Sequence, residues 1–194
     1  MVHGRWLITK TTKIEWKVEL MELIFPTIEM KQTAMEYRQE HINHGETHIH
    51  GSGSFLQAKD YESWLEKITS AKTASKTGWV DCSTYFVMLG DRIIGTTQIR
   101  HTLNDALRHD GGNIGYGVRP SERRRGYATK ILALALAECR KLGIDRVLVT
   151  CNTENLGSAK TILKNGGVLD SEFIDEHGNA AQRYWITLDE VVFC

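Results

Sequence analysis

The stretch that decides the fold is Tyr116-Gly117-Val118-Arg119-Pro120-Ser121-Glu122-Arg123-Arg124-Arg125-Gly126-Tyr127-Ala128. It continues an apolar segment, residues 113–118, whose length and composition are typical of a short strand. It leads into residues 126–142, where apolar side chains recur at i, i+3, i+4, i+7, i+8 and i+11. This spacing predicts an amphipathic helix. The stretch therefore joins a strand directly to a strong helix.

Three features of this loop favour the binding of an anion. The first N–H groups of a helix have no intrahelical partner and carry a partial positive charge. Gly126 can adopt backbone conformations that are closed to other residues. Arg123, Arg124 and Arg125 add donors that can bind an anion in a bidentate manner. The loop therefore predicts a phosphate or pyrophosphate site, although a solvated basic loop beside acidic neighbours would have the same composition.

The remaining patterns indicate an α/β domain. Asp60 is a candidate N-cap, and Gly90-Asp91 joins two β-branched segments into a hairpin. The pattern predicts strands from residue 21 and over residues 84–89, 92–99, 113–118, 146–151, 168–174 and 182–192, and helices over residues 30–44, 61–68, 126–142 and 158–164. This order predicts helices packed around one mixed sheet.

The composition is that of an ordinary folded domain. The chain has 194 residues, is 41% hydrophobic and 25% charged, and has a formal net charge of zero. A neutral chain has no general basic field to attract nucleic acid or anionic lipid. The four cysteines, Cys82, Cys139, Cys151 and Cys194, are widely spaced and are expected to be reduced and structural. We expect no membrane segment, because no apolar run approaches about 20 residues, and we expect a cytoplasmic location.

Residues 1–20 allow two interpretations. Met21 begins a strand-like segment, and Lys17-Val18-Glu19 can be encoded by a purine-rich stretch suited to ribosome binding. Residues 1–20 would then be an over-extended start that the domain does not need. Alternatively, they form a genuine N-terminal strand or arm. We expect a domain over residues 21–194, preceded by an extension over residues 1–20.

The loop also carries a recognisable motif. Arg123-x-x-Gly126-x-Ala128 resembles the [Q/R]-x-x-G-x-[G/A] motif of the GNAT N-acetyltransferase superfamily. Residues 114–132, IGYGVRPSERRRGYATKIL, are similar to the strand–loop–helix that binds acetyl-CoA in that family. Residues 147–167, VLVTCNTENLGSAKTILKNGG, resemble the strand and helix that follow. A single motif of this kind is weak, but two blocks in the correct order are specific.

The resemblance implies a GNAT-like, mostly antiparallel sheet flanked by helices, with splayed fourth and fifth strands. Acetyl-CoA would lie in the gap between these strands as the cosubstrate. The backbone of Tyr116, Gly117 and Val118 would pair with its pantetheine arm. Asn155 and Ser158 would lie near the pantetheine and the sulfur. The remaining cofactor-binding residues would contact the phosphates; these are Arg123, Arg124, Arg125, Gly126, Tyr127 and Ala128.

The residues that would move protons depart from the family pattern. Many members place a Tyr seven residues after the Asn as the acid, but this chain has Ile162 there. Many place a Glu on the fourth strand as the base, but residues 112–115 are Gly-Asn-Ile-Gly. The candidate catalytic residues are therefore His101 and Asp110 as bases and Tyr116 as an acid. Each of these three residues could equally be structural.

Four histidines fall within ten residues at His41, His44, His48 and His50. Their spacing matches no known metal motif, so we expect no metal. In the resembling fold, the loop between the first two helices borders the acceptor site. His48, His50, Ser52 and Ser54 could therefore shape the acceptor pocket, or could belong to a polar surface loop.

These observations favour an acetyl-CoA-dependent N-acetyltransferase that acts on a primary amine by direct attack. The acceptor would be a small-molecule amine or a peptide N-terminus, and the protein a monomer or homodimer. The missing Tyr and Glu support an alternative, a catalytically silent CoA-binding sensor or interaction module. Nucleic-acid binding is not expected, since three arginines without interleaved aromatic residues on a neutral chain make a weak footprint.

Overall fold

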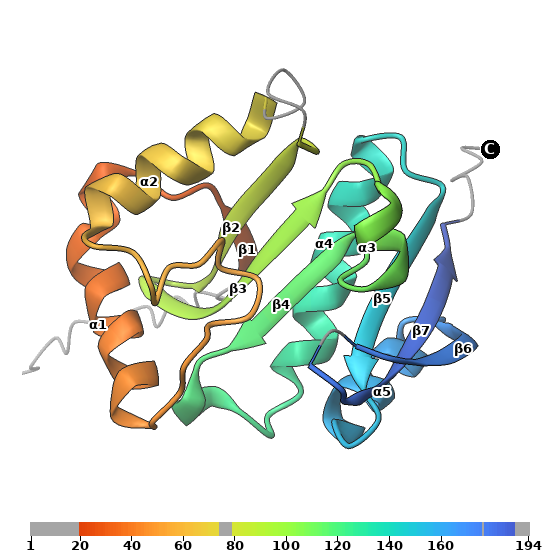
Figure 1. Ribbon diagram of the computed structural model, residues 1–194. Coiled ribbons are helices and arrows are strands. Elements are labelled where there is room, and N and C mark those ends of the chain that lie inside the picture. Colours follow the sequence, from red (N-terminus) through yellow and green to blue (C-terminus); the bar gives the residue numbers. More distant parts are fainter. Residues whose placement is uncertain (1–19, 74–78, 176, 189–194) are drawn as a thin grey trace, which may run out of the picture.

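A computed structural model describes residues 20–73, 79–175 and 177–188 (Figure 1). Two short 3-10 turns, η1 (Ile28–Met30) and η3 (Pro120–Glu122), accompany the regular elements. The strands are β1 (Met21–Ile24), β2 (Cys82–Leu89), β3 (Arg92–Arg100), β4 (Ile114–Val118), β5 (Arg146–Asn152), β6 (Val168–Ile174) and β7 (Ala180–Thr187). The helices are α1 (Lys31–Asn43), α2 (Tyr61–Ser70), α3 (Asp105–His109), α4 (Tyr127–Lys141) and α5 (Leu156–Lys164).

The strands form two antiparallel sheets. One has the order β1-β2-β3-β4, and the other has the order β5-β7-β6. The predicted hairpin at Gly90-Asp91 is confirmed, because Leu89 pairs with Arg92 across the turn. The predicted mixed fold is also confirmed, with the sheet divided between β4 and β5. Figure 1 shows β4 and β5 close together at their upper ends and apart at their lower ends.

Two large hydrophobic cores hold most of the helices against the sheets, and a smaller cluster of Val80, Cys82 and Leu107 packs α3. The predicted stripe of α4 is confirmed, since Leu132, Ala135 and Cys139 are fully buried against side chains of β5 and β7. The second core packs α1 and α2 on β2 and β3 around Trp64 and Phe86. The predicted N-cap of α2 is confirmed as a capping box, in which the Asp60 side chain accepts from the Ser63 N–H at 2.8 Å. The two cores therefore belong to two different halves of the chain.

Asn113 fastens the two sheets together at the point where they separate. It is only 2% exposed. Its backbone N–H donates to the Leu148 carbonyl at 2.7 Å, and its side-chain oxygen accepts from the Leu148 N–H at 2.9 Å. Its side-chain NH₂ donates to the Arg100 carbonyl at 3.1 Å. One asparagine thus replaces the ladder that a continuous sheet would have between β4 and β5.

The short helix α3 was not expected from the sequence. Asn104 caps it, with its side-chain oxygen accepting from the Leu107 N–H at 2.9 Å. Arg183 on β7 then holds its last turn, donating from Nε to the His109 carbonyl at 2.8 Å while its guanidinium lies 3.9 Å from the centre of the Phe173 ring. Helix α3 therefore bridges the two sheets at the end where Asn113 joins them.

The ends of some elements differ from the expectation. Helix α5 begins at Leu156, two residues earlier than expected, because Asn155 caps it. Strand β7 ends at Thr187, and residues 189–194, on which part of the expected last strand falls, lie outside the described residues. Residues 1–19 also lie outside them, so the proposed N-terminal extension stays a prediction. No helix in the described ranges has the length and apolar character required to span a bilayer.

We predict that Asn113→Ala lowers the free energy of unfolding by about 1–3 kcal/mol, because it leaves the buried Leu148 N–H without its side-chain acceptor. Urea denaturation at neutral pH measures this change. Asn43→Ala is a matched control, because Asn43 lies on the exposed surface of α1 and its side-chain oxygen accepts only from Gln39 in the described structure. A loss of stability no larger for Asn113→Ala than for Asn43→Ala would contradict the role of this side chain.

Candidate active site

The gap between the sheets opens into a cavity of about 1270 Å³. Most of the site residues expected from the sequence line it, including Asp110 from the α3–β4 turn. The others are Tyr116, Gly117, Val118, Arg123, Arg124, Gly126, Tyr127, Ala128, Asn155, Ser158, His48 and His50. Four expected residues, Arg125, Ser52, Ser54 and His101, are not part of this lining.

The loop before α4 forms a cradle of backbone N–H groups. Gly126, which caps α4, has φ +80°, and Arg124 has φ +62°, a conformation that side chains other than glycine rarely adopt. Nothing lies within 4 Å of the position that a Cβ of Gly126 would take. In the described structure, the backbone N–H groups of Arg124, Arg125 and Gly126 donate to no other backbone group outside the helix ladders. These N–H groups and those of the first turn of α4 are free to bind a ligand.

The three arginines of this loop have different partners. Arg123 forms an ion pair with Glu46 at 2.6 Å and also donates to the Val118 carbonyl at 3.1 Å. Arg125 pairs with Glu122 at 3.0 Å and does not line the cavity. Arg124 is exposed and takes part in none of the ion pairs found among the described residues. Of the three, Arg124 is therefore the cation most available to an anionic ligand.

A buried ion pair fixes the start of the same loop. Arg119 donates from Nε to Glu40 on α1 at 2.6 Å, and the Ser121 N–H donates to the other oxygen of Glu40 at 2.8 Å. The pKa of Glu40 is lowered to about 2. Burial alone would raise it, but the hydrogen bonds from Ser121 and Arg119 stabilise the carboxylate more strongly. The loop is thereby fastened to the helix of the other core.

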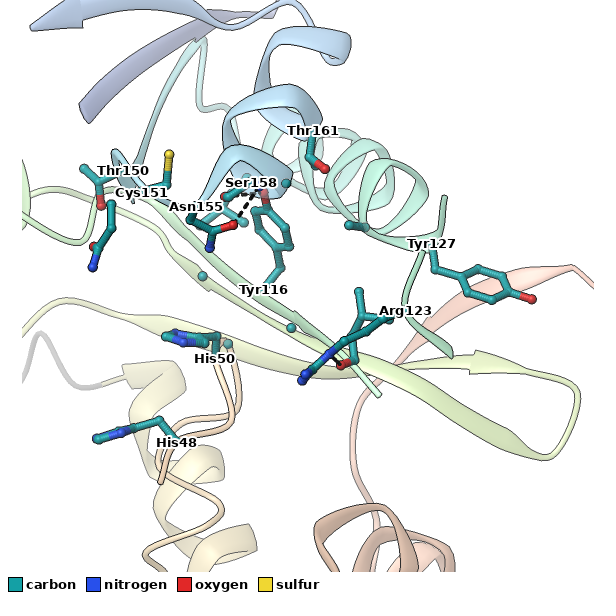
Figure 2. Close-up of a pocket in the computed structure, with 18 of the residues that line it drawn as sticks. His48, His50, Tyr116, Arg123, Tyr127, Thr150, Cys151, Asn155, Ser158 and Thr161 are labelled. Atoms are coloured by element: carbon teal, nitrogen blue, oxygen red, sulfur yellow. Dashed lines mark hydrogen bonds between the residues drawn. The ribbon is translucent and has the colours of Figure 1, made fainter. Parts of the chain in front are cut away.

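A pair of hydroxyl groups spans the middle of the cavity (Figure 2). The Tyr116 hydroxyl of β4 and the Ser158 hydroxyl of α5 lie 2.9 Å apart. Burial raises the pKa of Tyr116 to about 12, so its phenol stays protonated at neutral pH. Asn155 accepts from the Ser158 N–H at 3.0 Å and so fixes the helix start that carries this serine. Cys151 lies beside them, and burial raises the pKa of its thiol. A raised pKa keeps the thiol protonated and therefore unreactive.

The loop between α1 and α2 packs directly on β4. A Cβ at Gly51 would lie 2.4 Å from the Gly115 carbonyl oxygen, and a Cβ at Gly117 would lie 2.7 Å from the His50 carbonyl oxygen. Only glycine therefore allows this approach, which brings His48 and His50 to the cavity. Burial lowers the pKa of His50, so its ring is neutral at neutral pH.

Ser52 has a structural role in this loop. Its hydroxyl donates to the Ile49 carbonyl at 2.6 Å and accepts from the Phe55 N–H at 3.1 Å. It is 1% exposed, and both hydrogen bonds lie within its own loop. Ser52 therefore shapes the loop that presents His48 and His50, rather than lining the cavity itself.

The two candidate bases occupy different environments. The Nε2 of His101 lies 2.9 Å from the Ser83 hydroxyl, and burial lowers the pKa of this ring. Asp110 lines the cavity, and one of its oxygens accepts from the Thr150 hydroxyl at 3.4 Å. The same Thr150 oxygen accepts from the Gly111 N–H at 3.2 Å. The candidate base on the cavity wall is therefore Asp110.

Sequence reasoning missed several lining residues, among them Arg100, Thr150 and Glu46. Arg100 ends β3 and Glu46 lies in a loop, while Thr150 lies within the predicted strand, where nothing marks it as a site residue. The available signal was the glycine pair at 111 and 112, which marks a tight turn next to Arg100 and Thr150. Among the residues that the structure describes, no group of three or more His, Cys, Asp or Glu side chains could hold a metal ion.

Glu40 makes the free energy of unfolding depend on pH between about 4.5 and 2. Because its pKa falls from 4.5 to about 2 on folding, its contribution is complete above about pH 4.5 and is lost as the pH falls towards 2. We predict that Glu40→Gln costs about 1–3 kcal/mol at neutral pH, and that this difference from the unsubstituted protein shrinks below pH 4.5. Denaturant unfolding at a series of pH values measures it, with Glu36→Gln on the exposed face of α1 as the control. A difference that does not change with pH would refute the assignment.

Comparisons with known proteins agree with this geometry. The model of the Acetyltransferase (GNAT) domain matches residues 27–168. The uncharacterized N-acetyltransferase YjdG of Bacillus subtilis is 35% identical over 77 residues, which cover 38% of this chain and 40% of that protein.

Solved structures share the fold at low sequence identity. One is RimL, a ribosomal L7/L12 α-N-protein acetyltransferase in complex with coenzyme A, with a TM-score of 0.64 and 15% identity over 91% of this chain and 98% of that one. Another is the microcin C7 self-immunity acetyltransferase MccE in complex with acetyl-CoA and AMP, with a TM-score of 0.62 and 16% identity over 89% of this chain and 94% of that one. Because the family model matches most of the length of this chain, the chain belongs to the GNAT acetyltransferase family.

Proposed function

We propose that the protein is an acetyl-CoA-dependent N-acetyltransferase that acts on a primary amine by direct attack. The observation that carries the proposal is the cavity between β4 and β5, with free N–H groups at the start of α4 and a hydroxyl pair in its middle. Structural neighbours that hold coenzyme A or acetyl-CoA support it. The reaction forms a bond from the amine nitrogen to the acetyl carbon and breaks the bond from that carbon to sulfur.

Acetyl-CoA fits the cavity in one orientation. The pyrophosphate needs several N–H donors and a cation, and these lie together at Arg124, Gly126 and Ala128. The pantetheine arm would then run along β4 at Tyr116 to Val118. The partial positive charge of the α4 N-terminus favours the negative phosphates at this end and so directs the thioester towards the opposite end.

The hydroxyl pair is suited to protonate the departing thiolate. Ser158 would donate its proton to the sulfur while it takes one from the Tyr116 phenol, 2.9 Å away, and the resulting phenolate would recover its proton from water entering the cavity. The high pKa of Tyr116 keeps that proton available at neutral pH. Ile162, which stands where many relatives have a tyrosine, is fully buried in the core and offers no proton.

The ammonium must lose a proton before it can attack. Asp110 is the candidate base that lines the cavity, and a carboxylate there also attracts the incoming ammonium. We propose that Asp110 takes this proton, directly or through one water molecule. His101, whose Nε2 is engaged by the Ser83 hydroxyl outside the lining, then has a structural role.

The acceptor would enter from the side of the α1–α2 loop. His48 and His50 stand at this side of the cavity, and Ser52 holds the loop in shape. The structural neighbours include a protein N-acetyltransferase and an acetyltransferase of microcin immunity. A peptide N-terminus and a small amine are therefore both reasonable acceptor classes.

The first experiment tests the cosubstrate site with a matched pair of glycines. Gly126 and Gly143 both have positive φ, at +80° and +72°, and a Cβ would meet nothing within 4 Å at either position. Gly126→Val and Gly143→Val should therefore cost a similar stability, roughly 1–2 kcal/mol. Only Gly126→Val places a side chain in the cradle, so we predict that it alone weakens acetyl-CoA binding, by about tenfold or more. Isothermal titration calorimetry measures the affinity.

The same calorimetry, followed by a turnover assay, separates the alternatives. Equal acetyl-CoA affinity in the two folded variants would reject the cradle as the pyrophosphate site. Thiol release from acetyl-CoA with a panel of primary amines, confirmed by the mass of the acetylated product, then tests catalysis. Binding of acetyl-CoA without transfer to any amine or peptide would instead favour the catalytically silent CoA-binding module.

A second prediction concerns the acid. Ser158→Ala removes the proposed donor, and we expect it to lower kcat by about 10²-fold while leaving acetyl-CoA affinity within about twofold. Tyr116→Phe keeps the ring packing and removes only the relay, so its loss should be smaller. A Ser158→Ala protein with unchanged kcat would show that thiolate release needs no acid from this pair.

A further inference from the structure

Arg100 is a half-buried cation on the wall of the cavity. None of the ion pairs found among the described residues includes it. Arg119 and Arg123, in the loop before α4, differ from Arg100 in this respect. They form ion pairs with Glu40 and Glu46 respectively. A partly desolvated charge that forms no ion pair is costly, which is why such groups usually bind a partner of opposite sign. Asp110 attracts the Arg100 guanidinium but forms no ion pair with it.

The position of Arg100 is fixed from both ends of the residue. Its backbone N–H donates to the Asn113 carbonyl at 2.8 Å, and its carbonyl accepts from the Asn113 side chain at 3.1 Å. Its Nη1 donates to the carbonyls of Gly111 and Gly112 at 2.9 and 3.0 Å. Both glycines have positive φ, at +97° and +59°, so the turn that presents these carbonyls favours glycine. The guanidinium is therefore held in place by neutral groups.

This arrangement leaves donors for a ligand. A guanidinium has five N–H donors, and the described structure uses those of Nη1 alone in hydrogen bonds. A planar fork that is held in one orientation matches a carboxylate, which can accept two parallel hydrogen bonds from it. The preorganised head loses little conformational freedom on binding, so such a contact favours affinity.

Asp110 stands beside Arg100 on the same wall. Arg100 binds the Gly111 carbonyl, the Gly111 N–H binds Thr150, and Thr150 donates to Asp110. This chain of contacts keeps a cation and an anion next to each other at one end of the cavity without pairing them. A wall with one fixed charge of each sign is complementary to a ligand that carries an ammonium and a carboxylate close together.

We propose that Arg100 binds a carboxylate of the acceptor, so that the preferred acceptor is a primary amine with a carboxylate close to the reacting nitrogen. The class includes free amino acids and peptides with an acidic residue near the N-terminus. The proposal rests on the proposed function, because it names the acceptor class of the same site. A purely structural role, in which Arg100 only braces the glycine turn, would predict no such preference.

The experiment compares amines that differ only in the carboxylate. The probes are glycine, β-alanine, γ-aminobutyrate and phenylalanine, each against its carboxamide, and short peptides with Glu against Gln at the second position. Thiol release gives kcat and KM, and calorimetry with the CoA-saturated protein gives the affinity of each probe. We expect at least one acid–amide pair to differ by about tenfold or more in favour of the acid, mainly in KM and in affinity.

Substitutions then assign this preference to the side chain. Arg100→Gln should reduce the acid-to-amide ratio to nearly one and leave the KM for acetyl-CoA unchanged, and Arg100→Lys should restore part of the ratio. Arg140→Gln, on the exposed end of α4, is the control for loss of a positive charge. Thermal unfolding of each variant identifies any loss of fold, and Arg100→Lys, which keeps the charge, serves if Arg100→Gln unfolds.

The possible results separate the two proposals. Equal reaction and equal binding of acids and amides by the unsubstituted protein would overturn the inference, and so would a preference that survives in Arg100→Gln. Binding of the acids without any acetyl transfer would uphold Arg100 as a carboxylate site and count against the proposed function. Absence of both binding and transfer for every acidic probe would overturn the inference, whether or not neutral amines react.

Discussion

The hydrogen bonds of Asn113 are the constraint on which the site depends. A continuous sheet would pair β4 with β5 along their whole length and leave no room between them. Here one buried asparagine binds both backbone groups of Leu148 and both backbone groups of Arg100. The sheets are thereby joined at one point and are free to diverge beyond it. A longer ladder would close the cavity, and the loss of this junction would leave the spacing of its walls undefined.

Carboxylates of the N-terminal half hold the anion cradle from the other side. Glu40 binds the start of the loop through Arg119, and Glu46 binds its middle through Arg123. Both acids belong to the α1 region, whose core is separate from the core beneath α4. The loop before α4 is therefore linked to the α1 region by charge as well as by the close packing of the α1–α2 loop on β4. Because both pairs are partly buried, removing one partner would leave the other charge uncompensated.

The sequence allowed good prediction wherever one residue type has one physical consequence. The α4 stripe, the hairpin at Gly90-Asp91 and the cap at Asp60 were all predicted correctly, since each depends on local periodicity or turn chemistry. The short helix α3 was missed, because its 5 residues are too few to show a periodic pattern and its last turn is held by Arg183, from a strand more than seventy residues later. Arg100 was also missed, because the sequence does not show whether a charged residue at the end of a strand will form an ion pair in the folded protein.

The position of Ile162 shows why the proton donor cannot be assigned from a motif alone. This side chain is fully buried among apolar residues of the α4 core, so a hydroxyl there would need a partner that the core does not provide. A polar group on α5 can face the cavity one turn earlier, at Ser158, and Tyr116 reaches it from the opposite wall. In the proposed mechanism, this contact across the cavity takes the role that a single side chain on α5 would otherwise have. The sequence indicated each of these two residues separately, but their contact arises only from the way the folded chain brings β4 and α5 together, which a linear motif does not record.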